Sequence, residues 1–352
     1  MSNDNDSVVA VDLGTMFFQT AKFNSDGEID IETIRNSFVE LDATEDTEDI
    51  LKQNHWNYVK SDGKFYIIGE DSLKVAKMLP GKIELRRPMS DGVLNKGEDK
   101  KMLVLAKMID SSVGKAPSDD AVVCTCVSSE SADESQDSRF HRARIEGMFK
   151  RNGWNIKILE EAHAVIMSER PVVVEDGVEY PYSGIGVSFG AGRVNCVLAY
   201  KGMQITGMSV ARSGDWIDQK VADATDTPIS QVTSAKEKKL DFDNIDYDDD
   251  VIFALNAYYG AMMEYVFGLF AKKFSEVESE FDAPLDIVVA GGTSMPKGFA
   301  KKLHEVLKEL DLPFEVKSIY RAKDPRNSVV KGCLAAGRAY KKKLAKEKLS
   351  GD

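Results

Sequence analysis

The amino-acid sequence predicts an α/β protein made of two similar domains, each with a sheet covered by helices. The chain has 352 residues, more than the ~100–200 of a usual single domain, and 43% of them are hydrophobic. Three strand-like segments joined by short turns occur twice, about half a chain apart. Strands and helices alternate after each copy, which is typical of a mostly parallel sheet covered on both faces.

The first copy of this pattern begins close to the N-terminus. An apolar, β-branched run at 8–11 is followed by a second strand at 17–23 and by an alternating strand at 28–34. Asp26-Gly27 separates the last two, and Asp-Gly between strands is a strong hairpin signal. The second copy has strands at 185–189, 194–200 and 203–210, which predicts an internal duplication with one copy in each domain.

The remaining elements follow from hydrophobic periodicity. Residues 35–100 are mixed, with one short strand at 65–68 and a helix after Gly69. The other predicted strands are 121–127, 154–159 and 285–290. The other predicted helices are 100–109, 138–151, 161–169, 213–224, 234–240, 251–281, 298–310 and 329–348. Residues 241–250 are very acidic and predict a solvated loop.

Composition excludes several classes of protein. Lys and Arg total 46 against 58 Asp and Glu, so the net charge of −12 disfavours nucleic-acid binding. Four cysteines are too few for a disulfide scaffold, and the four histidines show no metal-ligand spacing with them. The acidic N-terminus resembles no signal peptide, and no apolar run reaches ~20 residues. We therefore expect a cytoplasmic protein with no direct membrane anchor.

Three predicted strands end in glycine-bearing turns, at 12–15, 190–192 and 291–293. Glycine lets backbone N–H groups approach an anion, and ligands of parallel sheets bind at the carboxyl ends of strands. The turns predict a phosphorylated ligand between two lobes, although each turn alone is also explained as an ordinary turn. Neither the P-loop nor the dinucleotide-binding spacing is present.

Two acidic positions have both a structural and a chemical interpretation. Asp12 at the end of a buried strand either caps a turn or holds Mg²⁺ through water. Glu160 and Glu161 begin a helix, where acidic residues are favoured by the helix dipole. The alternative is that one of them orients and polarises an attacking water.

The motifs, in order, resemble the actin-like ATPase superfamily, and most closely the bacterial actin homologues of the MreB and MamK type. The resemblance extends from about residue 8 to 340. The matching segments are the first phosphate loop at 9–15, an MreB-like stretch from Gly81 to Leu94, the first connecting segment at 159–162, the Ser213–Asp218 segment, the adenosine motif at 287–298 and the second connecting segment at 324–337.

This resemblance implies a two-lobed actin-like ATPase fold of duplicated ribonuclease-H-like domains, with ATP in the interlobe cleft. Domain I would comprise 1–165 and 338–352, with a small insertion subdomain at about 35–95. Domain II would comprise 166–337, with a small subdomain at about 212–284. The implied cofactors are ATP or ADP and Mg²⁺.

The resemblance also implies roles for individual residues. Glu161 takes the position of the catalytic acid, and Asp12 is the second catalytic residue and holds Mg²⁺ through water. The implied nucleotide-binding residues are Gly14 and Thr15 at the β-phosphate, Gly190, Ala191 and Gly192 on its other side, Lys236 and Glu237 at adenine and ribose, and Gly214, Gly291, Gly292, Thr293 and Met295. A branched side chain at Gly291 is expected to obstruct adenosine and to leave the fold intact.

The sequence departs from the family in the second phosphate loop. Ser188 stands where the family usually has Asp, and Arg193 stands where it often has Thr. Phe17 and Phe18 replace small polar residues of the first hairpin. Because serine carries no charge, the Mg²⁺ site loses a carboxylate, so we expect secure ATP binding and slow hydrolysis. Arg193 could offset some of the phosphate charge.

The resemblance implies a protein that polymerises with itself into filaments through head-to-tail contacts, with an unknown cargo or adaptor. No sequence-specific nucleic-acid partner is expected. Two alternatives remain: a non-polymerising or weakly catalytic ATP-gated switch, and a small-molecule kinase of the same superfold.

Overall fold

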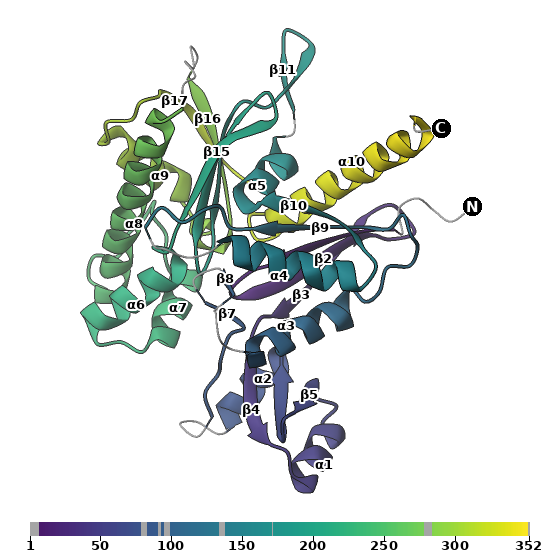
Figure 1. The fold of residues 1–352 in the computed structure, drawn as a ribbon. Coiled ribbons are helices and arrows are strands. Elements are labelled where there is room, and N and C mark those ends of the chain that lie inside the picture. The colour runs from purple at the N-terminus through teal and green to yellow at the C-terminus, as the bar shows by residue number, and fades with distance from the viewer. Residues whose placement is uncertain are drawn as a thin grey trace. The chain divides into compact units, whose positions relative to one another are not determined.

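The computed structural model describes residues 7–78, 83–90, 93–94, 99–133, 138–170, 172–277 and 284–350. Within the predicted MreB-like stretch, Gly81, Lys82, Asp91 and Gly92 lie outside these residues. The chain divides into two compact units (Figure 1). Unit 1 comprises Met1–Thr125, Phe140–Lys157 and Gly337–Asp352, and unit 2 comprises Cys126–Arg139 and Ile158–Ala336. The domain boundaries expected from the sequence stay a prediction.

The main sheet of unit 1 has the strand order β10-β9-β1-β2-β3. β1 pairs antiparallel with β2, β2 pairs antiparallel with β3, and β1 pairs parallel with β9. The strands are β1 (Val8–Leu13), β2 (Phe17–Phe23), β3 (Ile29–Arg35), β9 (Val122–Val127) and β10 (Asn155–Glu160). The helices α3 (Asp99–Ser112) and α4 (Ser138–Arg151) connect or follow these strands.

The main sheet of unit 2 repeats this topology, with the order β15-β14-β13-β16-β17. An antiparallel run of three strands comes first, and its first strand, β13, then pairs parallel with β16. The strands are β13 (Gly184–Phe189), β14 (Val194–Tyr200), β15 (Met203–Val210), β16 (Leu285–Ala290) and β17 (Val316–Arg321). The predicted duplication of an α/β fold is therefore confirmed.

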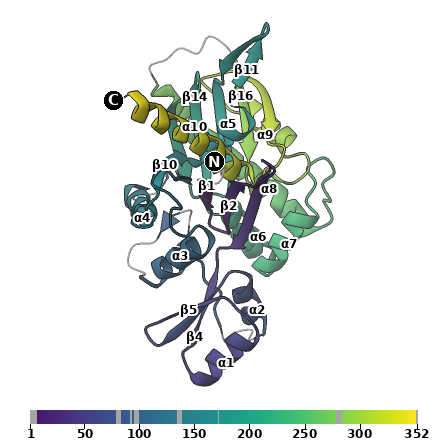
Figure 2. The ribbon, with the colours of Figure 1, turned by 90° about the vertical axis from the view of Figure 1, so that its right-hand side faces the viewer.

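Helices cover both faces of the unit 2 sheet. The helices are α5 (Glu161–Glu169), α6 (Gly214–Thr225), α7 (Ile229–Lys238), α8 (Asp250–Ser275), α9 (Phe299–Lys308) and α10 (Ser328–Ser350), the last of which continues into unit 1. Figure 1 shows α8 and α9 on one side of the sheet, and Figure 2 shows α5 on the other. The helix predicted at 251–281 ends earlier, at Ser275.

The side chains of β13 explain this layering, because successive residues of a strand point to opposite faces. Ile185, Val187 and Phe189 are fully buried in the core that contains α8 and α9. On the other face, a Cβ atom on Gly186 would overlap the carbonyl oxygen of Ala162 in α5. Glycine at this position therefore lets α5 lie directly against the strand.

A small three-stranded sheet forms the insertion in unit 1, with the order β4-β6-β5. Its buried core consists of Val39, Leu51, Phe65, Ile67 and Val75. The elements are β4 (Phe38–Asp42), α1 (Glu45–Gln53), β5 (Tyr58–Ser61), β6 (Lys64–Ile68) and α2 (Glu70–Met78). Of these, β6 and α2 were predicted from the sequence, whereas β4, α1 and β5 were not separated within the mixed region.

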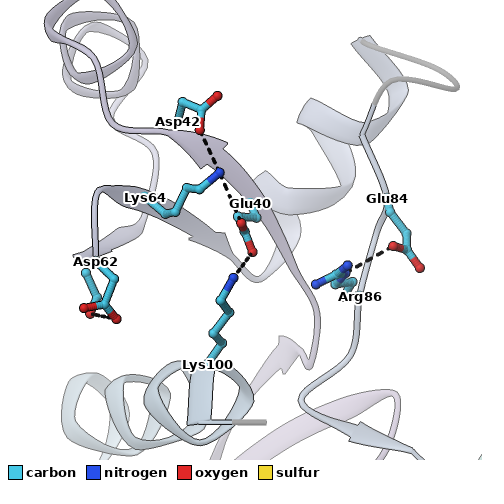
Figure 3. Close-up of polar contacts among 8 residues, drawn as sticks. Glu40, Asp42, Asp62, Lys64, Glu84, Arg86 and Lys100 are labelled. Atoms are coloured by element: carbon cyan, nitrogen blue, oxygen red, sulfur yellow. Dashed lines mark hydrogen bonds and ion pairs between the residues drawn. The ribbon is translucent and has the colours of Figure 1, made fainter.

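Charged side chains connect this small sheet to α3 (Figure 3). Lys64 on β6 lies 2.7 Å from Asp42 and 3.4 Å from Glu40 on β4, and Lys100 of α3 lies 3.1 Å from Glu40. Partial burial alone would raise the pKa of Glu40, but the two lysines hold that pKa below its ordinary value. Glu40 is therefore the acceptor through which the insertion binds α3.

Five further short elements lack sequence-based predictions. They are the hairpin of β11 (Val172–Glu175) and β12 (Val178–Pro181), and the pair β7 (Met89–Ser90) and β8 (Val93–Leu94), together with a 3₁₀ turn at Gly292–Ser294. All four cysteines are buried, and none of them forms a disulfide. Among the described residues, no helix combines the length and the apolar composition needed to cross a membrane.

Candidate functional site

The two glycine-bearing turns of unit 2 lie at the same edge of its sheet. β13 and β16 are parallel, with Ser188 opposite Ala290, so the turns 190–192 and 291–293 follow neighbouring strand ends. The Oγ1 atom of Thr293 donates a 2.8 Å hydrogen bond to the carbonyl oxygen of Gly190. The predicted residues of the second phosphate loop and the adenosine motif are therefore joined directly.

The N-terminus of α6 also binds these turns. The backbone N–H groups of Gly214 and Asp215 donate to the carbonyl oxygens of Gly190 and Ala191, at 3.2 and 2.8 Å. A Cβ atom on Gly214 would overlap the Thr293 hydroxyl. Gly214 therefore permits the helix to approach both turns closely, which unites three segments that are far apart in the sequence.

The two glycines of the adenosine motif have different surroundings. Gly291 has φ of +92°, and a Cβ atom there would overlap the backbone of Phe189. The expectation that a side chain at Gly291 leaves the fold intact is therefore wrong. A Cβ atom on Gly292 would instead meet no atom within 4 Å. Nearby, Met295 is 44% exposed.

Glu161 begins α5 and contacts two buried polar residues of the sheet. Ser188 Oγ on β13 donates to Glu161 Oε1 at 2.7 Å, and Asn195 Nδ2 on β14 donates to Oε2 at 3.0 Å. Ser188 and Asn195 are buried, at 1% and 0% exposure. Asn195 was missed from the sequence, where the available signal was an amide within an otherwise apolar strand.

Arg193 directly follows the second phosphate loop in the sequence and is buried, with 3% of its surface exposed. Its Nη1 atom donates to the hydroxyls of Ser131 and Ser209, both at 3.0 Å. These bonds join the segment Cys126–Arg139 to the residue before β14 and, through it, to β15, within unit 2. They give Arg193 a structural role, and the expectation that it offsets some of the phosphate charge stays a prediction.

Lys236 on α7 is 9% exposed and forms an ion pair with Asp218 on α6, which is 2% exposed. The Lys236 Nζ atom lies 2.7 Å from Asp218 Oδ1 and donates to the carbonyl oxygen of Gly214 at 3.2 Å. Thr233 Oγ1 donates to the other carboxylate oxygen at 2.7 Å. Lys236 thus stabilises the position of α6 beside the turns, while its neighbour Glu237 is exposed.

Lys236→Met should lower the free energy of unfolding by about 3–5 kcal/mol, because it leaves the Asp218 carboxylate buried without its cation. Urea denaturation of the nucleotide-free protein measures the change. Lys238→Met, which removes an exposed lysine from the same helix, is the matched control and should change stability little. Equal stability of both variants would show that the ion pair does not hold α6 and α7 together.

The remaining predicted residues lie in unit 1. Asp12 is in β1, and Gly14 and Thr15 form the turn that leads into β2. Asn36 Nδ2 donates to the carbonyl oxygen of Gly14 at 2.8 Å, and a Cβ atom on Gly14 would lie 2.7 Å from the carbonyl oxygen of Phe17. This turn is therefore compact and depends on glycine, and its assignment as a phosphate loop stays a prediction.

The two bulky residues of the first hairpin are part of the structure of unit 1. Phe18 is 1% exposed and belongs to the buried core, and Phe17 lies beneath the guanidinium of Arg35, 5.3 Å from the ring centre. Among the described residues, no group of three or more His, Cys, Asp or Glu side chains could hold a metal ion. The Mg²⁺ ion that the resemblance implies near Asp12 would therefore take most of its ligands from water and phosphate.

Comparison with solved structures shows the actin-like fold. The chain has a TM-score of 0.67 to a MamK double helical filament, at 18% identity over 95% of this chain and 98% of that one. It has a TM-score of 0.66 to MreB5 of Spiroplasma citri bound to AMPPNP, at 14% identity over 98% of both chains. MreB5 bound to ADP is similar, with a TM-score of 0.66 at 14% identity over 96% of this chain and 98% of that one.

No curated protein matches the chain. The family model described as Volactin matches residues 8–337, which is most of the sequence and includes both sheets and all three turns. With its duplicated sheets, the protein has an actin-like fold similar to the folds of MamK and MreB5. The chain belongs to the Volactin family.

Proposed function

We propose that this protein is an actin-like cytoskeletal ATPase that binds ATP with Mg²⁺, polymerises into filaments and hydrolyses ATP slowly. The observation that carries the proposal is the cluster at one edge of the unit 2 sheet. There, two glycine-bearing turns are hydrogen-bonded to each other, and Glu161 contacts the strand that leads into one of them. Solved relatives of the same fold hold AMPPNP or ADP.

The nucleotide would be held by the residues that the resemblance assigns. Gly190, Ala191 and Gly192 would offer backbone groups to the phosphates, and Gly292 and Thr293 would lie against adenosine. The open space beside Gly292 supports this assignment, because a ligand can approach the backbone there. Gly14 and Thr15 would contact the β-phosphate, and Asp12 would bind Mg²⁺ through water, as hard oxygen ligands do.

Glu161 would orient the attacking water and accept its proton. Its carboxylate accepts hydrogen bonds from Ser188 on Oε1 and from Asn195 on Oε2, and an ionised carboxylate is the form that can take a proton from water. Bound Mg²⁺ would neutralise charge on the phosphates. Because Ser188 supplies a neutral hydroxyl in place of a carboxylate, we infer that hydrolysis is slow.

Self-association is inferred from the same relatives, since one of them is a double helical filament. Identical subunits that contact each other head to tail form open filaments when the rotation between them does not close into a ring, and the proposed contact is of this open kind. The proposed partner is thus a second copy of the chain, in the cytoplasm. Ser188 is the observation that favours the alternative, an ATP-gated switch with weak catalysis.

The experiment that tests the proposal is sedimentation with nucleotide. At micromolar concentration the protein should pellet with ATP and Mg²⁺ and should stay in the supernatant with EDTA, and electron microscopy of the pellet should show filaments. Binding of a fluorescent ATP analogue is measured in parallel. Tight nucleotide binding without any pelleting, across salt and temperature, would favour the switch, and absence of binding would refute both functions.

A further inference from the structure

We propose that Ser188 and Asn195 are positioning residues that hold the Glu161 carboxylate in one orientation, and that Asn195 couples this orientation to the segment Cys126–Arg139. The inference rests on the proposed ATP hydrolysis, because it assigns Glu161 its task. Beyond that function, Ser188 and Asn195 are assigned the orientation of the carboxylate, and the segment Cys126–Arg139 is assigned the position of Asn195.

The hydrogen bonds of Asn195 determine its orientation. Its Nδ2 atom donates to Glu161 Oε2 at 3.0 Å, and its Oδ1 atom accepts from the backbone N–H of Ser129 at 3.0 Å. If the amide were rotated by half a turn, an oxygen would face a carboxylate and an NH₂ group would face an N–H donor. Since Asn195 is fully buried, water cannot compensate for that loss.

Ser188 completes the arrangement from the neighbouring strand. Its hydroxyl donates to Glu161 Oε1 at 2.7 Å, so Ser188 and Asn195 bind different oxygens of the carboxylate through neutral donors. An aspartate at this position would instead place a second carboxylate against Glu161. Two donors to the ionised form stabilise the charge and restrict rotation of the side chain, which is what a group that orients water requires.

The segment that binds Asn195 is itself fastened at several points. The Ser129 hydroxyl donates to Glu160, the residue before Glu161, and Ser209 Oγ donates to the Ser129 carbonyl oxygen at 2.8 Å. The side chain of Asp133 accepts from the backbone N–H of Ala211 at 3.0 Å. The contacts of Arg193 with Ser131 and Ser209 add to these.

The segment Cys126–Arg139 lies between two stretches of unit 1 in the sequence. It leaves unit 1 after Thr125, belongs to unit 2 from Cys126 to Arg139, and returns to unit 1 at Phe140. Through Ser129 and Asn195, the orientation of Glu161 is therefore linked to a segment that is covalently joined to unit 1 at both ends. The residues that carry the link are polar and buried, so their bonds are not exchanged with water.

The kinetic test uses isosteric variants of the full chain. Asn195→Asp replaces the donor to Glu161 with an oxygen while it retains the acceptor for Ser129. We expect kcat for phosphate release to fall about 10–100-fold with KM nearly unchanged, and the acidic limb of the pH–rate profile to move up by about 1–2 pH units, because paired carboxylates resist ionisation. Asn244→Asp, on an exposed loop of the same unit, is the control and should do neither.

The serine variants distinguish the effect of the Ser188 hydroxyl on kcat from the effect of its side-chain volume. Ser188→Cys keeps the size but donates weakly, and Ser188→Thr keeps the hydroxyl on a side chain that strands accept. Kcat should fall about 10-fold in the first and should be largely retained in the second, since a neutral hydrogen bond contributes about one tenfold step. Equal losses in both variants would indicate packing and not donation.

A second readout needs no nucleotide. In Asn195→Asp the pKa of the new carboxyl pair should be raised in the folded state. The folded protein then holds a shared proton between the two carboxyl groups, which stabilises the fold at about pH 4. This stabilisation is lost as the pH rises through the raised pKa of the folded state. The melting temperature of Asn195→Asp should therefore decrease relative to that of the parent as the pH increases from 4 to 8. Adding Glu161→Gln should restore it, because the repulsion then disappears.

Results that contradict the positioning of Glu161 differ from results that contradict the proposed ATPase. A parent that releases no phosphate would refute the ATPase, while the melting experiment would still test the Glu161–Asn195 contact. Normal hydrolysis that depends on Glu161, together with unchanged kcat, pH profile and melting in the Asn195 and Ser188 variants, would overturn the positioning inference.

Discussion

Glu161→Gln should reduce ATP hydrolysis by about 10²–10³-fold, which corresponds to about 3–4 kcal/mol of lost transition-state stabilisation. Glutamine keeps the shape of the side chain but cannot accept a proton from water, and its NH₂ group would face the donors Ser188 or Asn195. The fold should survive, because no charge is introduced. Phosphate release under saturating ATP and Mg²⁺ measures the effect.

Nucleotide binding and assembly give the internal control for this prediction. The variant should bind a fluorescent ATP analogue as the parent does, and its filaments should persist longer because ATP is consumed more slowly. Glu305→Gln, which changes an exposed glutamate of α9, should hydrolyse ATP at the parental rate. Hydrolysis that continues undiminished in Glu161→Gln would mean that another group orients the water.

Gly292→Val should weaken ATP binding by about 10–100-fold, because overpacking a binding surface costs ~1–3 kcal/mol and each 1.4 kcal/mol changes affinity tenfold. Gly292 is the suitable position, since a Cβ atom there meets no protein atom within 4 Å. The added side chain would therefore occupy space that the proposed adenosine needs, and the turn itself should be undisturbed. Titration with a fluorescent ATP analogue measures the affinity.

The matched control is Gly268→Val in α8, where a Cβ atom also meets nothing within 4 Å. Both variants should keep a melting temperature close to the parent, and Gly268→Val should keep parental affinity. Gly291→Val is unsuitable, because its side chain would overlap the backbone of Phe189 at a positive φ. Parental affinity in Gly292→Val would place the nucleotide elsewhere.

The regular elements could be predicted wherever hydrophobic periodicity was strong. The helices 138–151 and 161–169 match α4 and α5, and the two strand triplets match β1–β3 and β13–β15. Prediction was weaker in 35–100, where short strands carry few apolar positions and little periodicity. Strand β17 was missed as well, because its exposed edge position leaves a mixed pattern.

The candidate site was predictable only in part. The glycine turns and the pair Glu160 and Glu161 could be found, because strand–turn–helix motifs are local in sequence, and the family resemblance selected Glu161 from that pair. Asn195 could not be found, since its significance depends on pairing between β13 and β14 and on contact with α5. Lys236 was assigned to the nucleotide, whereas in the structure its ammonium group contacts Asp218 and the carbonyl oxygen of Gly214.

The sequence by itself therefore determined the α/β class, the duplication and the order of the glycine-bearing turns, because these depend on local pattern and spacing. Only the tertiary structure decided which polar groups face one another. Residues 129, 161, 188 and 195 come from four separate segments. Antiparallel pairing of β13 with β14, which sets Ser188 opposite Asn195, and the close approach of α5 bring them together. Long-range contacts of this kind leave no periodic signal in the chain, so the environment of Glu161 could be known only once the chain was folded.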